Sequence, residues 1–99
     1  MVTLEEARRI GVRACIHRLG ENFVLEHRES ATSVYSVNPD EAGEVFCYVG
    51  VDDAPQRLEK TDTLVLDNFS KFPYYASCNV SLMDGKSKFL DCFVPKMAN

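Results

Sequence analysis

The N-terminal part of the sequence places its apolar residues at helical spacing. Between residues 3 and 19 they recur on one side, while most charged residues lie on the other sides. Thr3 and Glu6 form a capping-box pair, and Gly20 is suited to the left-handed conformation in which many helices end. The pattern predicts one amphipathic helix over residues 3–19. Its apolar side consists of Leu4, Ala7, Ile10, Gly11, Ala14, Cys15 and Leu19.

Side chains in the middle of this apolar side are unusually small. Ala7, Gly11 and Ala14 would let the helix approach a sheet closely. Gly11 costs about 1 kcal/mol of helix propensity relative to alanine, so packing has to compensate for it. We therefore expect the helix to lie directly on a sheet.

After Gly20 the pattern changes to alternation of apolar and polar positions and to residues that favour strands. The predicted strands cover residues 23–29, 33–37, 44–51, 63–67, 74–83 and 86–94. The turn residues at 38–43 and the Asp84-Gly85 pair are too short for parallel crossovers, so the sheet should be antiparallel. The 99 residues suit one domain of the α+β class, with an N-terminal helix packed on a curved antiparallel meander of five or six strands.

Two registers are open for the last two strands. A two-residue loop at 84–85 would pair Cys78 with Asp91 and turn that carboxylate toward the core. A three-residue loop, with the glycine in a left-handed position, pairs Cys78 with Leu90 instead. Leu90 and Cys92 then share the apolar face, and we favour this register for that reason.

The segments TLEEARRIG, VYSV and GEVFCYVGVDD, taken as a helix start followed by strands, resemble small α+β domains of the PepSY-like and cystatin-like kind. The resemblance covers about half of the chain and concerns the architecture. It implies a helix followed by an antiparallel meander. PepSY-type domains usually occur in exported or membrane-attached proteins and have proposed inhibitory or partner-binding roles, so the lack of an export signal here departs from that pattern.

Charge and the N-terminal composition narrow the classes of partner. The chain carries 15 acidic and 11 basic residues, a net charge of −4, with no long basic cluster. Nucleic acids and anionic membranes select dense cationic surfaces, so neither is expected as a partner. The N-terminal residues lack a continuous apolar stretch, and we expect a cytoplasmic location.

The positions of the four cysteines favour burial. In the preferred register Ala76 pairs with Cys92, which leaves Cys78 and Cys92 as diagonal neighbours roughly 7–8 Å apart at Cα, beyond comfortable disulfide reach. Cys15 lies on the apolar side of the helix, and Cys47 alternates with valines. We interpret all four as free thiols that pack as small apolar side chains, although a disulfide stays open as a second interpretation.

Two chemical roles are the alternatives to burial of the cysteines. They are separated by 32, 31 and 14 positions, without the C-x-x-C spacing typical of zinc sites, so a structural metal site is an alternative only. A catalytic Cys-His pair would use His17 or His27, and both fit solvated or capping positions better. The sequence carries no glycine-rich phosphate loop and no hydrolase motif. We expect no catalytic residue, no metal and no cofactor.

The connection over residues 52–73 combines acidic and aromatic residues. Phe69 and Phe72 would either anchor this connection on the core or form a binding element. The acidic residues form a patch that we interpret as a solvated loop, with loose cation binding as the alternative: Asp52, Asp53, Glu59 and Asp62.

The second face of the sheet carries a large aromatic load. If the cysteines and the valines beside them face the helix, several aromatic side chains point the other way. These form either a second core or an interaction surface. The residues are Phe46, Tyr48, Tyr75, Phe89 and Phe93.

These observations lead to a first hypothesis and two alternatives. The hypothesis is a non-catalytic protein-binding or regulatory module whose simplest partner is a second copy, bound through the aromatic face or a sheet edge. The first alternative is a small-ligand or enzymatic pocket between helix and sheet, with His27, Tyr35, Asp91 and the cysteines as candidates. The second alternative is a structural metal site at the cysteines.

Overall fold

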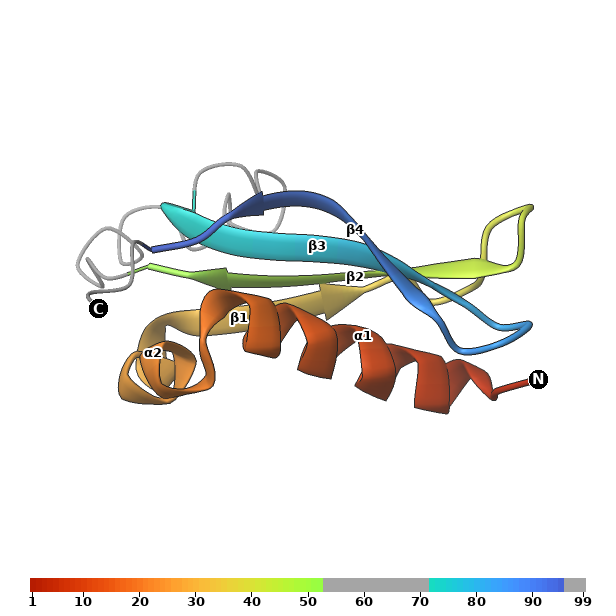
Figure 1. The fold of residues 1–99 in the computed structure, drawn as a ribbon, viewed down its shortest axis with the longest axis horizontal. Helices are drawn as coiled ribbons and strands as arrows, with labels where there is room; N and C mark the ends of the chain where they lie inside the picture. Colours follow the sequence, from red (N-terminus) through yellow and green to blue (C-terminus); the bar gives the residue numbers. More distant parts are fainter. Residues whose placement is uncertain (53–71, 96–99) are drawn as a thin grey trace.

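A computed structural model describes residues 1–52 and 72–95 of the chain. Within these residues one helix lies along one face of a four-stranded sheet (Figure 1). The strands follow one another in the order β1-β2-β3-β4, each antiparallel to its neighbours. The elements are α1 (Leu4–Leu19), α2 (Glu21–Glu26), the short 3-10 helix η1 (Arg28–Ser30), β1 (Ala31–Tyr35), β2 (Glu44–Val51), β3 (Tyr74–Ser81) and β4 (Ser87–Phe93).

The predicted N-terminal helix is confirmed at both of its ends. The Thr3 hydroxyl accepts the Glu6 backbone N–H, and the Glu6 carboxylate accepts the Thr3 backbone N–H, each at 3.0 Å. At the other end Gly20 has a φ of 107° and donates its N–H to the carbonyls of Ile16 and His17. Local capping chemistry therefore sets the length of α1.

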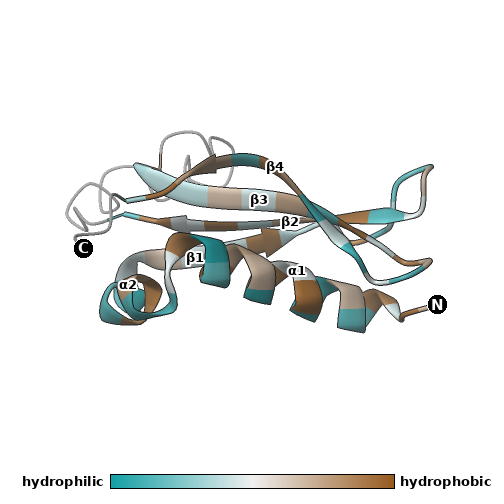
Figure 2. Ribbon diagram, viewed as in Figure 1, coloured by the Kyte–Doolittle hydropathy of each residue, from teal (hydrophilic) through white to brown (hydrophobic). Residues whose placement is uncertain are grey.

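The small residues of α1 allow the close approach that the sequence indicates. The helix packs mainly on β2 and β3, and Figure 2 shows that its successive turns carry both apolar and polar residues. A Cβ atom on Gly11 would overlap the Cys47 sulfur and stand 2.7 Å from Cys47 Cβ and 3.0 Å from Val80 Cγ2. The buried residues of α1 form one line: Ala7, Gly11, Cys15 and Leu19.

The strand predicted over residues 23–29 is wrong, because this segment forms α2 and η1. Phe23 and His27 are one turn apart, with ring centroids 4.7 Å apart, and His27 Nδ1 lies 2.9 Å from the Phe23 carbonyl oxygen. The Phe23 ring also meets the edge of Tyr74 at 5.3 Å. A contact with a distant strand thus stabilises a helical turn where the local residue types favour a strand.

The remaining strand predictions are mostly confirmed. β2 has the predicted bounds, β3 and β4 are slightly shorter than predicted, and β1 begins two residues earlier than expected. The strand predicted over residues 63–67 lies outside the described residues. The six-strand, cystatin-like order is therefore not confirmed, and the architecture that the described residues have is a helix on a four-stranded open sheet.

The register of the last hairpin differs from the preferred one near the turn. Val80 lies opposite Ser87 rather than Lys88, because the backbone of Leu82 makes other bonds. Its N–H donates to the Gly43 carbonyl at 3.0 Å and its carbonyl accepts the Val2 N–H at 2.9 Å, so Leu82 does not pair across the hairpin.

An irregularity in β4 restores the predicted register farther from the turn. Between Cys78 and Ala76 the pairing shifts by one residue, and Ala76 lies opposite Cys92 as predicted. Leu90 and Asp91 together therefore oppose Ser77, as in a β-bulge. The predicted pairing of Cys78 with Leu90 is wrong.

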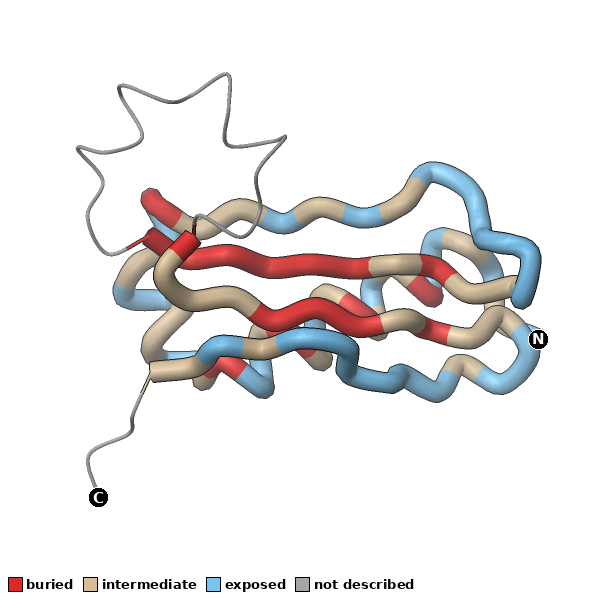
Figure 3. The backbone as a smooth tube through the Cα atoms, turned by 90° about the horizontal axis from the view of Figure 1, so that it is seen from above, coloured by how far each residue is buried: buried red, intermediate tan, exposed pale blue. Residues whose placement is uncertain are grey.

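Burial follows the order of the strands. The core consists of residues from α1, β2 and β3, and Figure 3 shows long buried stretches in the two central strands beside more exposed outer strands. Among the described residues, none of the helices has the length and apolar character required to cross a membrane.

We predict that Gly11→Ala destabilises the fold by about 1–3 kcal/mol, because the added methyl group overlaps Cys47. This loss should exceed the gain of about 1 kcal/mol in helix propensity. Urea denaturation measures the change in the free energy of unfolding. In a Cys47→Ala background the same substitution should cost less, and an unchanged or higher stability of Gly11→Ala would contradict the close packing.

Candidate functional site

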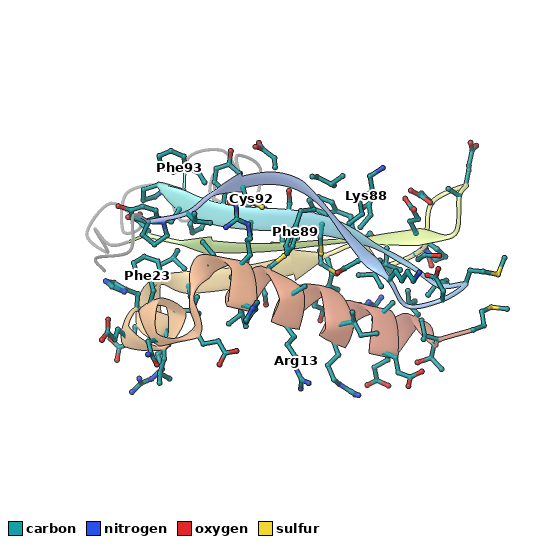
Figure 4. The ribbon with its side chains drawn as sticks, viewed as in Figure 1. Arg13, Phe23, Lys88, Phe89, Cys92 and Phe93 are labelled. Carbon is teal, nitrogen blue, oxygen red and sulfur yellow. The ribbon has the colours of Figure 1, made fainter. Side chains whose placement is uncertain are left out.

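The outer strand β4 exposes three large apolar side chains. Phe89 is 42% exposed, Leu90 50% and Phe93 58%, although they lie in regular strand or at its bulge. Figure 4 labels Phe89, Cys92 and Phe93 along this strand. Within the described sheet β4 pairs only with β3, so its other edge has no strand partner. Exposed apolar edge strands are typical sites of strand pairing with another chain.

The predicted aromatic face is divided between buried and exposed residues. Tyr48 is only 3% exposed, and it stacks on Tyr75 with ring centroids 5.8 Å apart. The ring centroids of Phe72 and Tyr48 are 6.2 Å apart, and a Cβ atom on Gly50 would stand 2.8 Å from Phe72 Cγ. Burial raises the pKa of the Tyr48 hydroxyl. This part of the face is a small second core that includes the buried Phe72, whereas Phe69 lies outside the described residues.

The strand register places Phe46 and Phe93 on the same face of the sheet as Tyr48 and Tyr75. Phe46 lies opposite Asn79 and Phe93 opposite Tyr75, and both are more exposed than Tyr48. Phe93 also stacks on Tyr74 with ring centroids 6.0 Å apart. The aromatic rings at the β4 side are therefore the accessible ones.

Phe89 does not share the face that the sequence pattern assigns to it. It lies opposite Cys78, whose side chain is buried against α1, so Phe89 is directed to the α1 side of the sheet. The shifted register near the turn is the reason, since a slip of one residue exchanges the two faces. Phe89 remains exposed because it belongs to the outer strand.

A polar cluster stabilises the bulge of β4. The Ser77 hydroxyl donates to the Asp91 carbonyl at 2.9 Å and accepts the Asp91 N–H at 3.2 Å. The Tyr75 hydroxyl donates to the Asp91 carboxylate at 2.9 Å, and this bond raises the pKa of Tyr75. The side chains of β3 thus supply bonds that the irregular ladder lacks, and the exposed strand keeps a defined shape.

The fold brings three of the four cysteines together. Cys15 on α1, Cys47 on β2 and Cys78 on β3 are fully buried, and the sulfurs of Cys15 and Cys78 are 3.7 Å apart. The Cys78 thiol donates to the Gly11 carbonyl at 3.6 Å. Cys92 is partly exposed, and all four are free thiols. The prediction of buried, unbridged cysteines is confirmed for Cys15, Cys47 and Cys78.

The electrostatics of these thiols oppose nucleophilic chemistry. The hydrogen bond with Cys15, together with burial, raises the pKa of Cys78 from 9.0 to about 12. The hydrogen bond with Cys78 and burial also raise the pKa of Cys47. Since the thiolate is the reactive form, these groups stay protonated and unreactive at neutral pH. Among the described residues no group of three or more potential ligands has the arrangement of a metal site.

The residues proposed for an internal pocket lie apart. His27 follows α2 and contacts the Phe23 ring. Tyr35 is on β1, with its ring centre 4.8 Å from the Arg8 guanidinium. Asp91 belongs to the bulge of β4. The space between α1 and the central strands is filled by buried side chains. Asp52 is buried rather than solvated, and the other members of the predicted acidic patch lie outside the described residues.

A groove that the sequence pattern did not reveal lies between α1 and β1. Because α1 sits over β2 and β3, the α1 side of β1 is left uncovered. The groove has a volume of about 770 Å³, and three of its lining residues are the arginines Arg8, Arg9 and Arg13. Its apolar lining comes from three elements: Val12, Ile16, Leu25 and Tyr35. The run of arginines on α1 is the signal in the sequence that indicates its charge.

No family model, curated protein or solved structure matches this chain in the three comparisons. Geometry is therefore the basis for assigning a function.

We predict that a thiol reagent such as DTNB modifies Cys92 at least about 100-fold faster than the other cysteines of the native protein at neutral pH. Cys92 is partly exposed, whereas Cys15, Cys47 and Cys78 are buried. The absorbance of the released thionitrobenzoate gives the rates, and urea should release the slow thiols. Cys92→Ser should remove only the fast phase; rapid modification of a buried cysteine would argue against their inert character.

Proposed function

We propose that this protein is a non-catalytic protein-binding module that pairs with a second copy of itself through the outer edge of β4. The observation that carries this proposal is the exposure of Phe89, Leu90 and Phe93 on a strand without an outer neighbour in the described sheet. Exposed apolar area on an edge strand is costly in water, and pairing with another strand removes that cost. The raised pKa values of the buried thiols and the filled interior favour a surface role over catalysis or an internal ligand.

The backbone of β4 supports pairing at its centre. Ser81 of β3 donates its N–H to the Lys86 carbonyl, so these two residues occupy a hydrogen-bonded position at the start of the β3–β4 ladder. In an antiparallel ladder such pairs alternate with pairs whose amide groups point outward. Ser87 and Phe89 therefore direct their N–H and C=O groups to the open edge. A second strand would find hydrogen-bonding groups beside the exposed aromatic ring.

The charged residues of β4 limit the registers in which two β4 strands can pair. A two-fold axis at Phe89 would set the two Phe89 side chains opposite each other and Ser87 opposite Asp91 of the second copy. An axis at Lys88 or at Asp91 would instead place like charges directly opposite each other, which is destabilising. The Phe89-centred register thus combines apolar contact with charge compatibility, and the amide groups of Phe89 are directed to the open edge.

The remaining aromatic residues contribute in different ways. Phe93 exposes an aromatic ring on the same strand beyond the bulge, and it lies with Phe46 on the opposite face of the sheet from Phe89. Tyr48 and Tyr75 support the sheet beside β4 through their stacked rings. The binding surface proposed here is therefore the edge of β4 rather than the whole aromatic face.

We predict that Phe89→Lys lowers self-association at least about tenfold, because it would place two lysines opposite each other across the two-fold axis. Sedimentation velocity over a range of concentrations measures the dissociation constant. Phe89→Leu keeps an apolar side chain and should stay within a few-fold of the wild type.

Val37→Lys is the matched control for adding a charge at an exposed apolar position. Val37 is 71% exposed and follows the opposite edge strand, so this variant should associate like the wild type. The melting temperature of each variant shows whether the fold is retained. A wild type that stays monomeric to about 1 mM, or equal association of Phe89→Lys and the wild type, would reject the dimer.

A further inference from the structure

The groove between α1 and β1 lies at the edge of the sheet opposite β4. Ser33 and Tyr35 of β1 line it, and Arg8, Val12 and Ile16 of α1 face them. Leu25, an exposed apolar side chain of α2, contributes to the same groove. The groove therefore combines an outer strand, an apolar lining and cationic side chains in one place.

We propose that this groove binds an extended, acidic segment of another protein, which adds to β1 as a further strand. This site is separate from the β4 edge and does not depend on dimerisation there. Its occupant is defined by chemistry: an extended backbone that pairs with β1, with acidic and apolar side chains that alternate along it.

The backbone of β1 presents the required hydrogen-bonding groups. Asp52 donates its N–H to the Ser30 carbonyl, and Ser36 donates its N–H to the Phe46 carbonyl, so the even-numbered residues of this segment pair with β2. The odd-numbered residues between them direct their amide groups away from β2. Within the described residues the N–H groups of Ser33 and Tyr35 are therefore available to an added strand.

The same register determines which side chains of the added strand enter the groove. Tyr35 lies opposite Cys47, and Ser33 lies opposite Val49, both of which are buried core residues on the α1 side. Residues of an added strand opposite Ser33 and Tyr35 would point to the same side. Every second side chain of the occupant would thus contact α1 and Leu25.

Charge selects an acidic occupant. Arg9 and Arg13 are exposed, and neither forms an ion pair with another described residue. Arg13 extends from α1 on the side away from the sheet (Figure 4), so it forms the outer rim of the groove. The acidic lining residues Glu5 and Glu21 lie toward the two ends of α1, which leaves a cationic middle in a protein of net charge −4. A carboxylate at the middle of the groove would pair with these guanidinium groups.

Arg8 has a structural role in the groove, because its guanidinium is engaged by this chain's own residues. Its Nη2 donates to the Val37 carbonyl at 2.8 Å, and its guanidinium lies 4.8 Å from the centre of the Tyr35 ring. These contacts hold the end of β1 against α1. The strand edge is thus fixed before a ligand arrives, which lowers the entropic cost of binding.

The test uses a fluorescein-labelled peptide, Thr-Glu-Thr-Val-Thr-Glu-Thr-Val-Thr, and its counterpart with lysine in place of glutamate. Fluorescence anisotropy should show saturable binding of the acidic peptide and at least about tenfold weaker binding of the lysine peptide. The double variant Arg9→Glu/Arg13→Glu should bind the acidic peptide at least about tenfold more weakly. Arg18→Glu, a charge reversal on the same helix outside the groove, should stay within about twofold.

A backbone variant separates strand addition from simple charge attraction. Ser33→Pro removes an outward N–H that β2 does not use, so it should abolish peptide binding while the melting temperature stays close to that of Ser33→Thr. Phe89→Lys should still bind the peptide, so failure of the dimer and failure of this site are distinguishable. The proposal is overturned by no saturable binding to about 1 mM, by equal affinity for both peptides, or by equal competition from an oligothymidine of nine nucleotides.

Discussion

The close approach of α1 to the central strands at Gly11 is the constraint on which the rest of the structure depends. A Cβ at this position would overlap the Cys47 sulfur, so only glycine lets the helix settle on β2 and β3. The buried line from Ala7 to Leu19 then covers the central strands with few large side chains. Burial of these apolar groups is the main stabilising term, and its position decides which parts of the sheet stay uncovered.

One helix centred on two strands leaves two strands at the edges. β4 exposes apolar side chains beyond the helix, and β1 forms the lining of a cationic groove beside it. These two surfaces have different chemistry, since the first is mainly apolar and the second combines arginines with apolar residues. The described part of the fold therefore has two chemically distinct sheet edges, and our two proposals assign self-association to one and binding of an acidic segment to the other.

The cysteines show how packing rather than chemistry explains an unusual residue content. Three fully buried thiols meet between α1, β2 and β3, where close packing leaves little room for larger side chains. The pKa values of Cys47 and Cys78 are raised, which keeps these thiols protonated. The small size of the three cysteine side chains, and not their reactivity, therefore explains their position in the core.

The sequence by itself determined the elements whose signals are local: the ends of α1 at Thr3 and Gly20, the bounds of β2, and the inward position of the central cysteines. Periodicity and capping act within a few residues, so the sequence alone is sufficient to predict them. Tertiary structure decided the rest, because partners distant in sequence prevailed over local preference. Contact with Tyr74 stabilises a helical turn at Phe23, bonds from Leu82 to Gly43 and Val2 change the hairpin register, and that register moves Phe89 to the other face. The groove arises only where α1 and β1 come together in space, so no local pattern could reveal it.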